Sequence, residues 1–561
     1  MTAIAIFGLA TISMAQNVRA WGTYYTGTGQ IWPFGEDRGN SCITDASGNV
    51  YMVGFTSSNS DIATAGAHQT VHAGGPTSGG TGSYDAFLVK FNSSGVRQWA
   101  TYYGGSGNDM GISCAVDASG NVYMIGSTSS TSGIATVGAH DTTVNDGFLV
   151  KFNSNGVRQW GTYFESVGNA CAIDVSDNVY IVGSTNSTTG IATTGTHQTV
   201  MSGSKDAFLV KFNSSGVKQW GTYFGGPFGE DGFSCATDAL GNVYMAGMTS
   251  STAGIATAGA HDTIYGGSLF SADAFLVKFD PNGLRQWGTY YGSAGVDIGY
   301  SCATDASGNV YLAGDSQQDG LPDTSGMTTT GAHQSTYGGG YSDAFLVKFD
   351  PNGLRQWGTY YGGSMLDVSF SCETDASGNV YISGETQSTT GIATPGAHQT
   401  TVDDAFLVSF NASGVRQSGT YYGGFKTVCT ADASGNVYMT GYTQSSSGIA
   451  TAGAHQTVNG NDGYNDAFLV KFTGSSVGIN EISNEKSFTI YPNPAKSIVN
   501  VKADTKLIGS LYIIYDNTGK VVLSGKIYAE NTSVDMCNLS TGIYLFSVGE
   551  NLMQTCKVIK E

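Results

Sequence analysis

Acidic side chains recur at one place in the sequence, five residues before a repeated cysteine. Five of the seven copies carry one there: Asp37, Asp109, Glu230, Asp297 and Asp367. Clustered carboxylates can bind a cation or the hydroxyl groups of a sugar, and a close pair can act as general acid and base on a polysaccharide. Alternatively, each carboxylate caps the turn beside it. The residue types alone leave both roles open.

Other reactive groups also return once per copy, which favours structural roles. We expect the aspartate before each ASGN-type turn to cap that turn rather than bind calcium. We expect the repeated cysteine to be a small buried side chain and the histidine of each GAHQT-type segment to be packed in its loop. No copy carries a unique set of His, Tyr, Arg or Glu residues, which argues against catalysis. The sequence indicates no cofactor, and nothing in it supports calcium.

Short strands and turns must position these residues. One full copy reads SCATDASGNVYLAG (Ser301–Gly314), then a polar loop, then DAFLVKFDPNG (Asp343–Gly353) and LRQWGTYYGG (354–363). Asn and Gly in ASGN and DPNG supply tight turns, and FLVKF is the apolar run of a strand that is packed on both faces. Each copy is therefore predicted to form four antiparallel strands.

The number of copies predicts a closed ring. The first three strands of the unit each occur seven times, whereas the fourth first occurs as Val18–Tyr25, ahead of every other strand, and never after Phe472. If Val18–Tyr25 pairs with Asp466–Phe472, the last unit is complete and two exposed sheet edges disappear. The prediction is an all-β, seven-bladed β-propeller of four-stranded blades, closed by the N-terminal strand and monomeric.

These segments resemble the SBBP beta-propeller repeat family. Its pattern GNVYVTG, a PGAFQT-like loop, DAFVAKL and STYLGGSGDD is matched in all seven copies, although His stands in the loop motif where the family has Phe. The resemblance implies a propeller, which we place at residues 17–473. It implies no catalytic residues, because the family has no shared ones.

The sequence changes character after Phe472. Residues 474–486 read as a polar linker, and residues 487–561 contain FTIYPNPAKS, YDNTGKVV and STGIYLFSV. These segments resemble the type A C-terminal sorting domain of the type IX secretion system. The resemblance implies a small Ig-like β-sandwich, the type IX secretion machinery as a partner, and an extracellular location, secreted or attached to the outer-membrane surface. Its motif residues here are Tyr491, Pro492, Asn493, Pro494, Gly519, Lys520, Gly542 and Tyr544.

Composition limits the remaining classes of protein. Only 12% of the residues are charged and the formal net charge is −19, so we expect no nucleic-acid partner. Residues 1–15 read as a secretory signal peptide, with a short buried strand as the alternative. No other stretch approaches 18 apolar residues, so we expect no transmembrane segment.

The sequence thus favours a non-enzymatic scaffold that is secreted or held at the cell surface and binds glycan or protein. The loop between the second and third strands spans 20 residues from Gly126 to Asp146 but 31 from Gly54 to Asp85, so the face that carries it is the expected recognition surface. The five carboxylates named first are expected around the channel mouth on that face. One alternative is a polysaccharide hydrolase or lyase that uses these carboxylates, and another is a structural surface-layer component.

Overall fold

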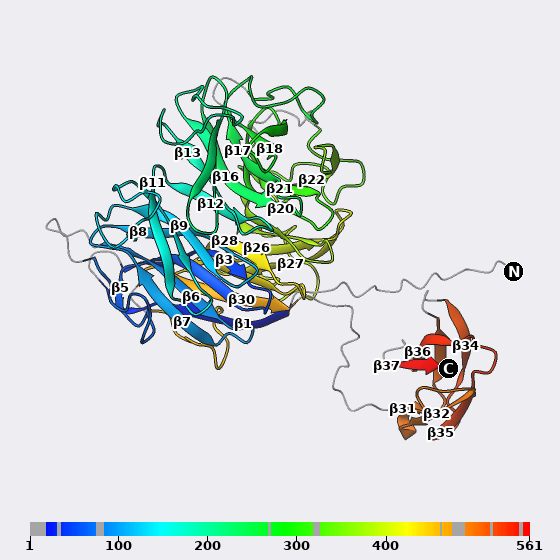
Figure 1. The fold of residues 1–561 in the computed structure, drawn as a ribbon. Coiled ribbons are helices and arrows are strands. Elements are labelled where there is room, and N and C mark those ends of the chain that lie inside the picture. Colours follow the sequence, from blue (N-terminus) through cyan, green and yellow to red (C-terminus); the bar gives the residue numbers. More distant parts are fainter. Residues whose placement is uncertain are drawn as a thin grey trace. The chain divides into compact units, whose positions relative to one another are not determined.

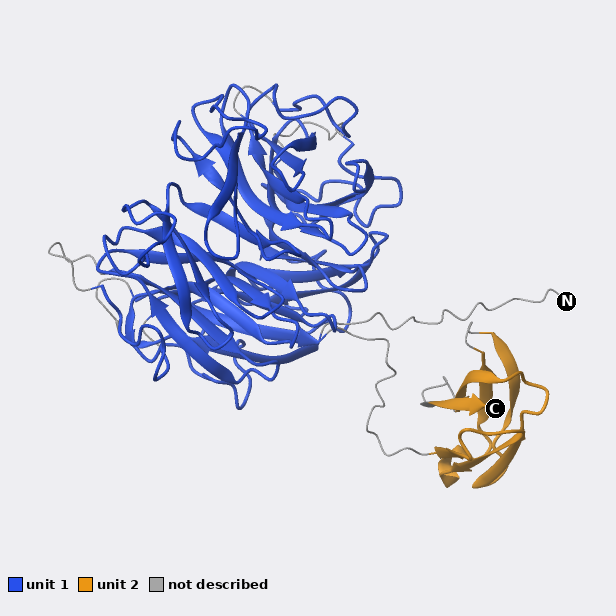
Figure 2. Cartoon of the chain, viewed as in Figure 1, with its two compact units in different colours: residues 1–476 blue, residues 477–561 orange. Residues whose placement is uncertain are grey.

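A computed structural model describes residues 18–30, 35–74, 83–267, 271–317, 326–460, 463–473, 488–516, 520–548 and 554–561. The predicted signal peptide, the predicted linker and Gly519 lie outside these residues. Over the described part the chain is built almost entirely from β-strands (Figure 1). It forms two compact units, residues 1–476 and residues 477–561, which are described separately (Figure 2).

The first unit contains seven four-stranded antiparallel sheets, numbered here by the chain order of their first strands (Figure 1). Sheet one is β3 (Asp37–Thr44), β4 (Val50–Thr56), β6 (Asp85–Phe91) and β7 (Arg97–Tyr103). Sheet two is β8 (Asp109–Val116), β9 (Val122–Thr128), β10 (Gly147–Phe152) and β11 (Arg158–Phe164). Sheet three is β12 (Gly168–Ile173), β13 (Val179–Thr185), β14 (Asp206–Phe212) and β15 (Lys218–Phe224). Sheet four is β16 (Glu230–Thr237), β17 (Val243–Thr249), β18 (Asp273–Phe279) and β19 (Arg285–Tyr291).

Sheet five is β20 (Val296–Thr304), β21 (Val310–Gln317), β22 (Asp343–Phe349) and β23 (Arg355–Tyr361). Sheet six is β24 (Asp367–Thr374), β25 (Val380–Thr386), β26 (Ala405–Phe410) and β27 (Arg416–Tyr422). Sheet seven is β28 (Phe425–Ala431), β29 (Val437–Thr443), β30 (Asp466–Thr473) and β1 (Val18–Tyr25). The short strands β2 (Thr28–Gln30) and β5 (Ser58–Ser60) pair with each other.

Local chemistry explains why every sheet repeats the same geometry. The middle strands, such as β4 and β6, are buried along almost their whole length because a neighbouring sheet covers each face. Between the first two strands, the Asp45 carboxylate accepts hydrogen bonds from the N–H groups of Ser47 (2.9 Å) and Asn49 (3.0 Å). The equivalent aspartates of the other six sheets make the same contacts, so the predicted turn caps are confirmed.

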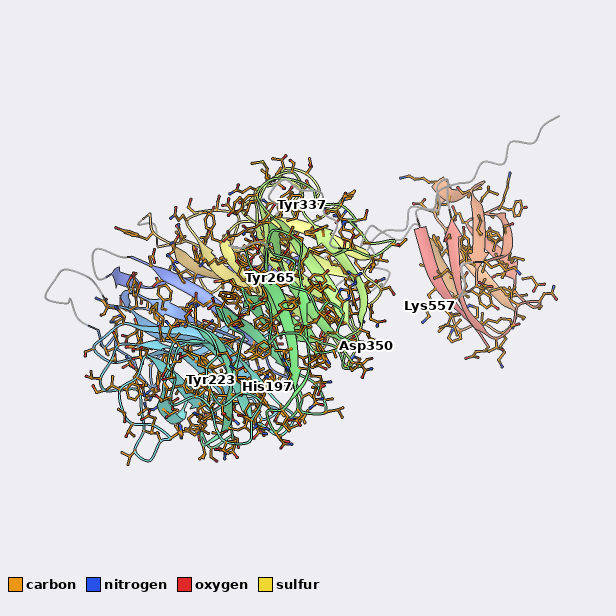
Figure 3. All side chains as sticks on the ribbon, turned by 90° about the horizontal axis from the view of Figure 1, so that it is seen from above. His197, Tyr223, Tyr265, Tyr337, Asp350 and Lys557 are labelled. Atoms are coloured by element: carbon orange, nitrogen blue, oxygen red, sulfur yellow. The ribbon has the colours of Figure 1, made fainter. Side chains whose placement is uncertain are left out.

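The first strands of the sheets form a closed cycle of neighbours. Each of them contacts the first strand of the next sheet, in the order β3, β8, β12, β16, β20, β24 and β28, and β28 in turn contacts β3. Apolar clusters fill the space between adjacent sheets: Tyr180 and Leu209 of sheet three, for example, pack with Val243 and Phe275 of sheet four. Figure 3 shows side chains filling this unit throughout. This is the arrangement of a β-propeller, with the first strands innermost.

The predicted pairing between the two ends of the repeat region is confirmed. Strand β1 lies antiparallel to β30, with Val18 opposite Thr473 and Tyr25 opposite Ala467. It thereby supplies the fourth strand of sheet seven. The Tyr25 ring also packs against Phe87 of sheet one at a centroid distance of 5.2 Å, so β1 joins the last sheet to the first.

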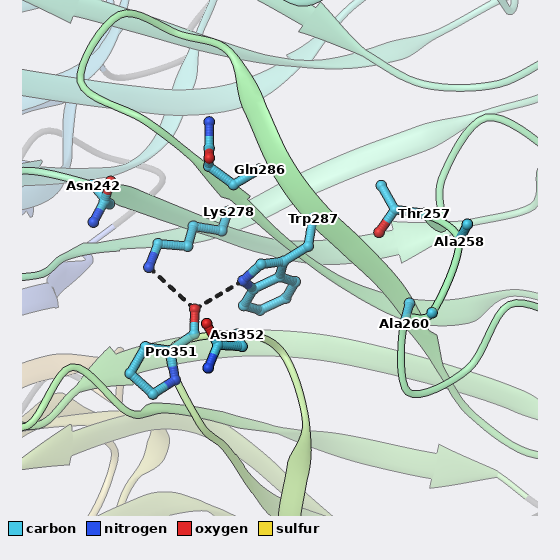
Figure 4. A pocket seen from close by; sticks show the side chains of 10 residues that line it. Asn242, Thr257, Ala258, Ala260, Lys278, Gln286, Trp287, Pro351 and Asn352 are labelled. Carbon is cyan, nitrogen blue, oxygen red and sulfur yellow. Dashed lines mark hydrogen bonds between the residues drawn. The ribbon is translucent and has the colours of Figure 1, made fainter.

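In six of the seven sheets, a tryptophan and a lysine hold the sheet against the turn of the next one. In sheet four, Trp287 Nε1 and Lys278 Nζ both donate to the backbone carbonyl of Pro351 in sheet five, at 3.0 and 3.2 Å (Figure 4). A β-carbon on Gly353, whose φ is +82°, would lie 2.8 Å from the indole ring, so only glycine fits there. The cleft beside this contact measures about 400 Å³, but the Trp287 and Lys278 donors are already used.

This contact recurs at six of the seven junctions between sheets. In sheet six, serines replace both residues: Ser409 stands in place of the lysine and Ser418 in place of the tryptophan, with their hydroxyl groups 2.8 Å apart. The reason is topological, because the third and fourth strands of sheet seven are opposite ends of the repeat region. These two strands, β30 and β1, are not consecutive in the chain, so a tryptophan at position 418 would lack the turn between third and fourth strands that the other junctions provide.

The second unit contains two antiparallel sheets that share one apolar core. The first has the order β31 (Phe488–Tyr491), β32 (Ile498–Ala503) and β35 (Asn531–Asp535). The second has the order β34 (Val521–Lys526), β33 (Leu511–Tyr515), β36 (Gly542–Val548) and β37 (Gln554–Lys560). Val501, Ile514 and Phe546 lie in the core between them, and the 3-10 helix η1 (Thr505–Leu507) connects β32 to β33.

All nine cysteines are free thiols. The seven repeated ones are buried, as predicted: Cys42, Cys114, Cys171, Cys235, Cys302, Cys372 and Cys429. Cys537 and Cys556, which lie in the second unit, do not form a disulfide with each other.

Removing β1 tests the closure of the first unit. A chain that starts at Thr26 is expected to unfold at a clearly lower temperature than one that starts at Val18, because the edge of β30 loses its partner and Tyr25 leaves the core. Thermal unfolding followed by circular dichroism measures this difference. Equal melting temperatures for the two chains would show that β1 does not close the unit.

The tryptophan contact can be tested with a matched pair of positions. Trp160→Ala is expected to lower the free energy of unfolding by about 3 kcal/mol, because it empties a packed site and leaves the Ser214 carbonyl without its indole donor. Ser418→Ala, at the junction without a turn, is expected to change it by less than about 1 kcal/mol. Chemical denaturation of both variants gives the comparison, and similar losses at the two positions would contradict the proposed role of the turn.

Candidate functional site

The carboxylates predicted at the channel mouth are buried and engaged within their own loops. All five are fully shielded from solvent. Asp109 is typical: its carboxylate accepts hydrogen bonds from Gly105 N–H (2.9 Å), Ser130 Oγ (2.6 Å) and Thr128 Oγ1. It therefore ties the loop that enters the first strand of sheet two to the end of the second strand.

The other members of this set have the same kind of partners. Asp37 accepts from Gly27 N–H and Ser58 Oγ, and Asp367 from Gly363 N–H and Ser388 Oγ. Glu230 accepts from Gly226 N–H and Thr249 Oγ1, and Asp297 from Ser293 N–H and Oγ. Burial raises the pKa of Asp37, Asp109, Glu230 and Asp367, and the hydrogen bonds partly oppose it. These contacts agree with the alternative in which each carboxylate caps the turn beside it. A role of the five residues in ligand binding stays a prediction.

The repeated histidines are packed between adjacent sheets. The His197 ring, labelled in Figure 3, lies 6.1 Å from the Phe224 ring of sheet three and 5.9 Å from the Phe279 ring of sheet four. Burial lowers the pKa of His68, His197, His333 and His455 to about 4, so these rings are neutral near pH 7. No group of three or more His, Cys, Asp or Glu residues suited to a metal ion occurs in the described part of the chain.

Two positions at the loop end of the inner strands differ between the sheets. The first position is a bulge in the first strand, at the residue that has no partner in the second strand. It lies two residues before the repeated cysteine. From sheet one to sheet six it is Asn40, Ile112, Asn169, Phe233, Tyr300 and Phe370, and in sheet seven the register shift lies between Phe425 and Val428. A bulged residue is not opposed across the ladder, so its side chain can vary without disturbing the sheet.

The second position follows the glycine near the end of the second strand. From sheet one to sheet seven it is Phe55, Ser127, Ser184, Met248, Asp315, Glu385 and Tyr442. We refer to the seven aromatic residues gathered at or beside these two positions as the aromatic crescent: Phe233, Tyr300, Phe370, Phe425, Tyr442, Phe55 and Tyr84. Sheets two and three contribute none of them.

Three rings of the crescent contact one another from sheet to sheet. The Tyr300 ring lies between Phe233, at a centroid distance of 5.6 Å, and Phe370, at 5.3 Å. These three side chains come from sheets four, five and six, and each is partly exposed. They form one continuous apolar wall across three sheets.

A second arc of the crescent spans sheets seven and one. The Arg38 guanidinium lies over the Tyr442 ring, 4.4 Å from its centroid, and 5.7 Å from that of Phe55. Phe425 packs against Tyr442 at 5.9 Å, and Tyr84 against Phe55 at 4.9 Å. Arg38 also forms an ion pair with Glu36 at 2.8 Å.

Carboxylates stand beside both arcs. Burial raises the pKa of the Tyr300 and Tyr442 phenols. The charges of Asp315 and Glu385 add to the rise at Tyr300, and Glu385 adds to the rise at Tyr442, so Glu385 lies near both arcs. Asp315 is 2% exposed, and its Oδ1 has no hydrogen-bond partner among the residues described. Burial raises the pKa of Asp315 to about 7, which places its ionisation near neutral pH.

Glu373 is a further acidic residue that no other sheet repeats. It follows the repeated cysteine, where the other sheets have Ile43, Ala115, Ala172, Ala236, Ala303 and Thr430. Its charge acts on the thiols of Cys42, Cys302, Cys372 and Cys429, which belong to four different sheets, so it lies towards the middle of the ring. Burial raises the pKa of Glu373 to about 7.

The expectation that no copy carries a unique set of residues was therefore wrong. The signal was present in the sequence, because the bulge position and the position after the second-strand glycine vary while their neighbours stay the same. The repeated carboxylates form the more regular pattern in the sequence, whereas the residues at these two positions form none. The bulge itself could not be located from the sequence, since only the observed register shows which residue leaves the ladder.

The buried Asp315 carboxyl predicts a dependence of stability on pH. Its pKa of about 7 in the folded protein lies above its value in the unfolded chain, so folding favours the protonated form. The native protein should lose stability as the pH rises from 4 to 7, by up to about 1.4 kcal/mol per pH unit from this group. Asp315→Asn is expected to remove that loss, so its advantage over the native protein should be larger at pH 8 than at pH 5. Denaturant titrations at the two pH values give the two differences, and a constant difference would contradict the assignment.

Two family descriptions match parts of the chain. Residues 489–561 match the secretion system C-terminal sorting domain. Residues 98–133, 219–253 and 286–322 match the beta-propeller repeat. Both resemblances seen in the sequence are thereby confirmed.

Curated relatives are distant and much longer. An uncharacterized WD repeat-containing protein of Acanthamoeba polyphaga mimivirus is 22% identical over 431 residues, which are 62% of this chain but 30% of that protein. The regulatory protein FlaEY of Caulobacter vibrioides is 28% identical over 195 residues, which are 33% of this chain and 19% of that protein. The chain therefore spans less than a third of either relative.

Solved structures with a similar backbone fold also have low sequence identity to this chain. PorZ, a surface component of the type IX secretion system of Porphyromonas gingivalis, is 12% identical, with 92% of this chain and 58% of PorZ covered and a TM-score of 0.34. The polysaccharide lyase Uly1 is 8% identical, with 82% of this chain and 99% of Uly1 covered and a TM-score of 0.39. At these scores neither likeness carries an argument about function.

The sorting domain indicates export to the extracellular space or the cell surface, and it implies interaction with the type IX secretion machinery. In the described part of the chain, no helix has the length and apolar character required to span a membrane. The chain is therefore an exported protein that joins SBBP beta-propeller repeats to a type IX secretion system C-terminal sorting domain.

Proposed function

We propose that this protein is a binding scaffold without catalytic activity, which recognises glycan or protein outside the cell through the loop-bearing face of its propeller. The observation that carries the proposal is the contrast between the two ends of the strands. At the turn end, the aspartate caps are present in all seven sheets and the tryptophan contacts in six. At the loop end, both the loop lengths and the inner-strand side chains differ. Variation on a rigid frame is what recognition requires.

We further propose that the seven sheets are the seven blades of one closed, monomeric propeller over residues 17–473. The cycle of contacts from β3 to β28 and back, together with the pairing of β1 with β30, supports this reading. We propose that residues 487–561 form an Ig-like sandwich, which two antiparallel sheets around one core support. Residues 1–15 remain proposed as a signal peptide and 474–486 as a linker.

A polysaccharide hydrolase or lyase is the second candidate. The carboxyl group of Asp315 is the observation in its favour, since a pKa of about 7 suits a general acid at neutral pH, although the side chain is only 2% exposed. The carboxylates Asp37, Asp109, Glu230, Asp297 and Asp367, which the sequence suggested for this chemistry, support it less, because each is fully buried and hydrogen-bonded in its own loop.

A binding screen that also monitors turnover tests the proposal. The purified exported protein is expected to bind at least one class of immobilised polysaccharide or surface protein saturably, with the same affinity in calcium and in a calcium chelator. Bound polysaccharide should keep its chain length after prolonged incubation, as measured by size-exclusion chromatography and reducing-end assay. Shortened chains would replace the proposal with the enzymatic candidate, and the absence of any binding would favour a structural surface-layer component.

A further inference from the structure

We infer that the aromatic crescent binds a glycan chain that carries no anionic groups, that is, a neutral or amine-bearing polysaccharide. The inference rests on the proposed function and names both the place and the class of ligand. Its place is the loop end of the inner strands in sheets four, five, six, seven and one.

The apolar wall of the crescent suits the faces of sugar rings. A pyranose ring has an apolar face of C–H groups and a rim of hydroxyl groups, so it packs on aromatic rings while its rim needs polar partners. Phe233, Tyr300 and Phe370 offer adjoining, partly exposed rings with centroid spacings of 5.6 and 5.3 Å. A flat ligand much smaller than this wall would leave rings uncovered, which favours a chain over a single sugar.

Polar groups accompany the rings at the rim. Glu385 accepts a hydrogen bond from Lys426 N–H at 2.8 Å, and a carboxylate can accept further ones from sugar hydroxyl groups. The side chain of Asn465 donates to Glu36 at 3.2 Å, beside Arg38. The crescent therefore combines a stacking surface with acceptors for hydroxyl groups.

Charge excludes anionic glycans. Asp315 and Glu385 flank Tyr300, and Glu373 lies in the same sheet as Phe370, three residues further along β24. The nearby cation Arg38 is already paired with Glu36, and Lys426 contacts Glu385 through its backbone N–H. The chain as a whole has a formal net charge of −19. A uronate or sulfated polymer would meet repulsion here, whereas amines would be attracted.

The crescent extends over sheets four to seven and sheet one, and this arrangement determines the path that a bound glycan chain would take. In the two equivalent positions, sheet two has Ile112 and Ser127, and sheet three has Asn169 and Ser184. Asn169 Nδ2 is held by the Gly232 carbonyl at 2.8 Å and offers no stacking surface. A bound chain would therefore follow the five aromatic sheets and leave over sheets two and three. These two sheets also provide matched control positions on the same frame.

The test measures the binding of the full-length protein to three soluble polymers: a neutral β-glucan, partly deacetylated chitosan and polygalacturonate. We expect binding to the β-glucan or to chitosan and at least tenfold weaker binding to polygalacturonate. Tyr300→Ala and Phe370→Leu should each weaken binding at least tenfold, whereas Ile112→Ala, at the equivalent position of sheet two, should leave it unchanged. Phe370→Leu keeps an apolar side chain, so it stays informative if Tyr300→Ala does not fold. Circular dichroism confirms folding.

The outcomes separate the inference from the proposed function. Binding to a polysaccharide that survives both crescent variants would overturn the inference and leave the binding scaffold standing. Equal affinity for polygalacturonate would overturn the assignment of ligand class. If none of the three polymers binds, the inference fails, and a protein partner found by capture on immobilised surface proteins would still support the scaffold. In the double variant Asp315→Asn and Glu385→Gln, affinity for polygalacturonate should rise relative to the native protein, and no rise would contradict the role given to charge.

Discussion

The antiparallel pairing of β1 with β30 is the interaction on which the first unit depends. Each of the other sheets is a continuous stretch of chain that can form from local turns. Sheet seven is complete only when the two ends of the repeat region meet. The backbone of β1 also bonds to the loop of sheet seven, where Thr451 N–H donates to the Gly22 carbonyl at 2.9 Å. On its far side, Trp21 Nε1 donates to the Ser93 carbonyl of sheet one at 3.1 Å. One strand thus binds both the loop of its own sheet and the turn of sheet one.

The serine pair in sheet six is the counterpart of this closure. Six junctions gain stability from an indole and an ammonium group that share one turn carbonyl of the next sheet. The junction between sheets six and seven lacks that turn, so a lysine there would have no carbonyl of the next sheet to contact, as Lys278 and Lys348 have in their sheets. Ser409 and Ser418 satisfy each other instead. The inner strands still connect the two sheets, since Cys429 N–H donates to Ser371 Oγ at 3.2 Å. The two substitutions therefore follow from the order of the strands and need no functional explanation.

Repetition made the fold readable from the sequence and the candidate site hard to read. Seven copies of NVY and of the FLVKF-type and QWGTYY-type segments predict strand positions and turn types, and the displaced copy at Val18–Tyr25 predicts the closure. The repeated carboxylates, by contrast, suggested chemistry only because the sequence does not show burial. Their partners are Thr and Ser hydroxyl groups at the end of the neighbouring second strand, such as those of Thr128 and Ser130 for Asp109. Residues that differ between copies, such as Asp315 and Tyr300, indicate the candidate site better than the repeated ones do. A residue that changes in one repeat only can be interpreted once its neighbours in space are known.

The bulge in the first strands explains how such differences can accumulate without loss of the fold. At most positions of a sheet, a side chain packs against the next sheet, and a change of volume is costly in a closed ring because every junction must fit. The bulged residue is released from the ladder and lies at the loop end of the innermost strand, where it can be Asn, Ile, Phe or Tyr. A ring of similar sheets thereby acquires one side with aromatic side chains and one side, at sheets two and three, without them at these positions. The asymmetry that recognition needs is confined to the positions where the fold tolerates it.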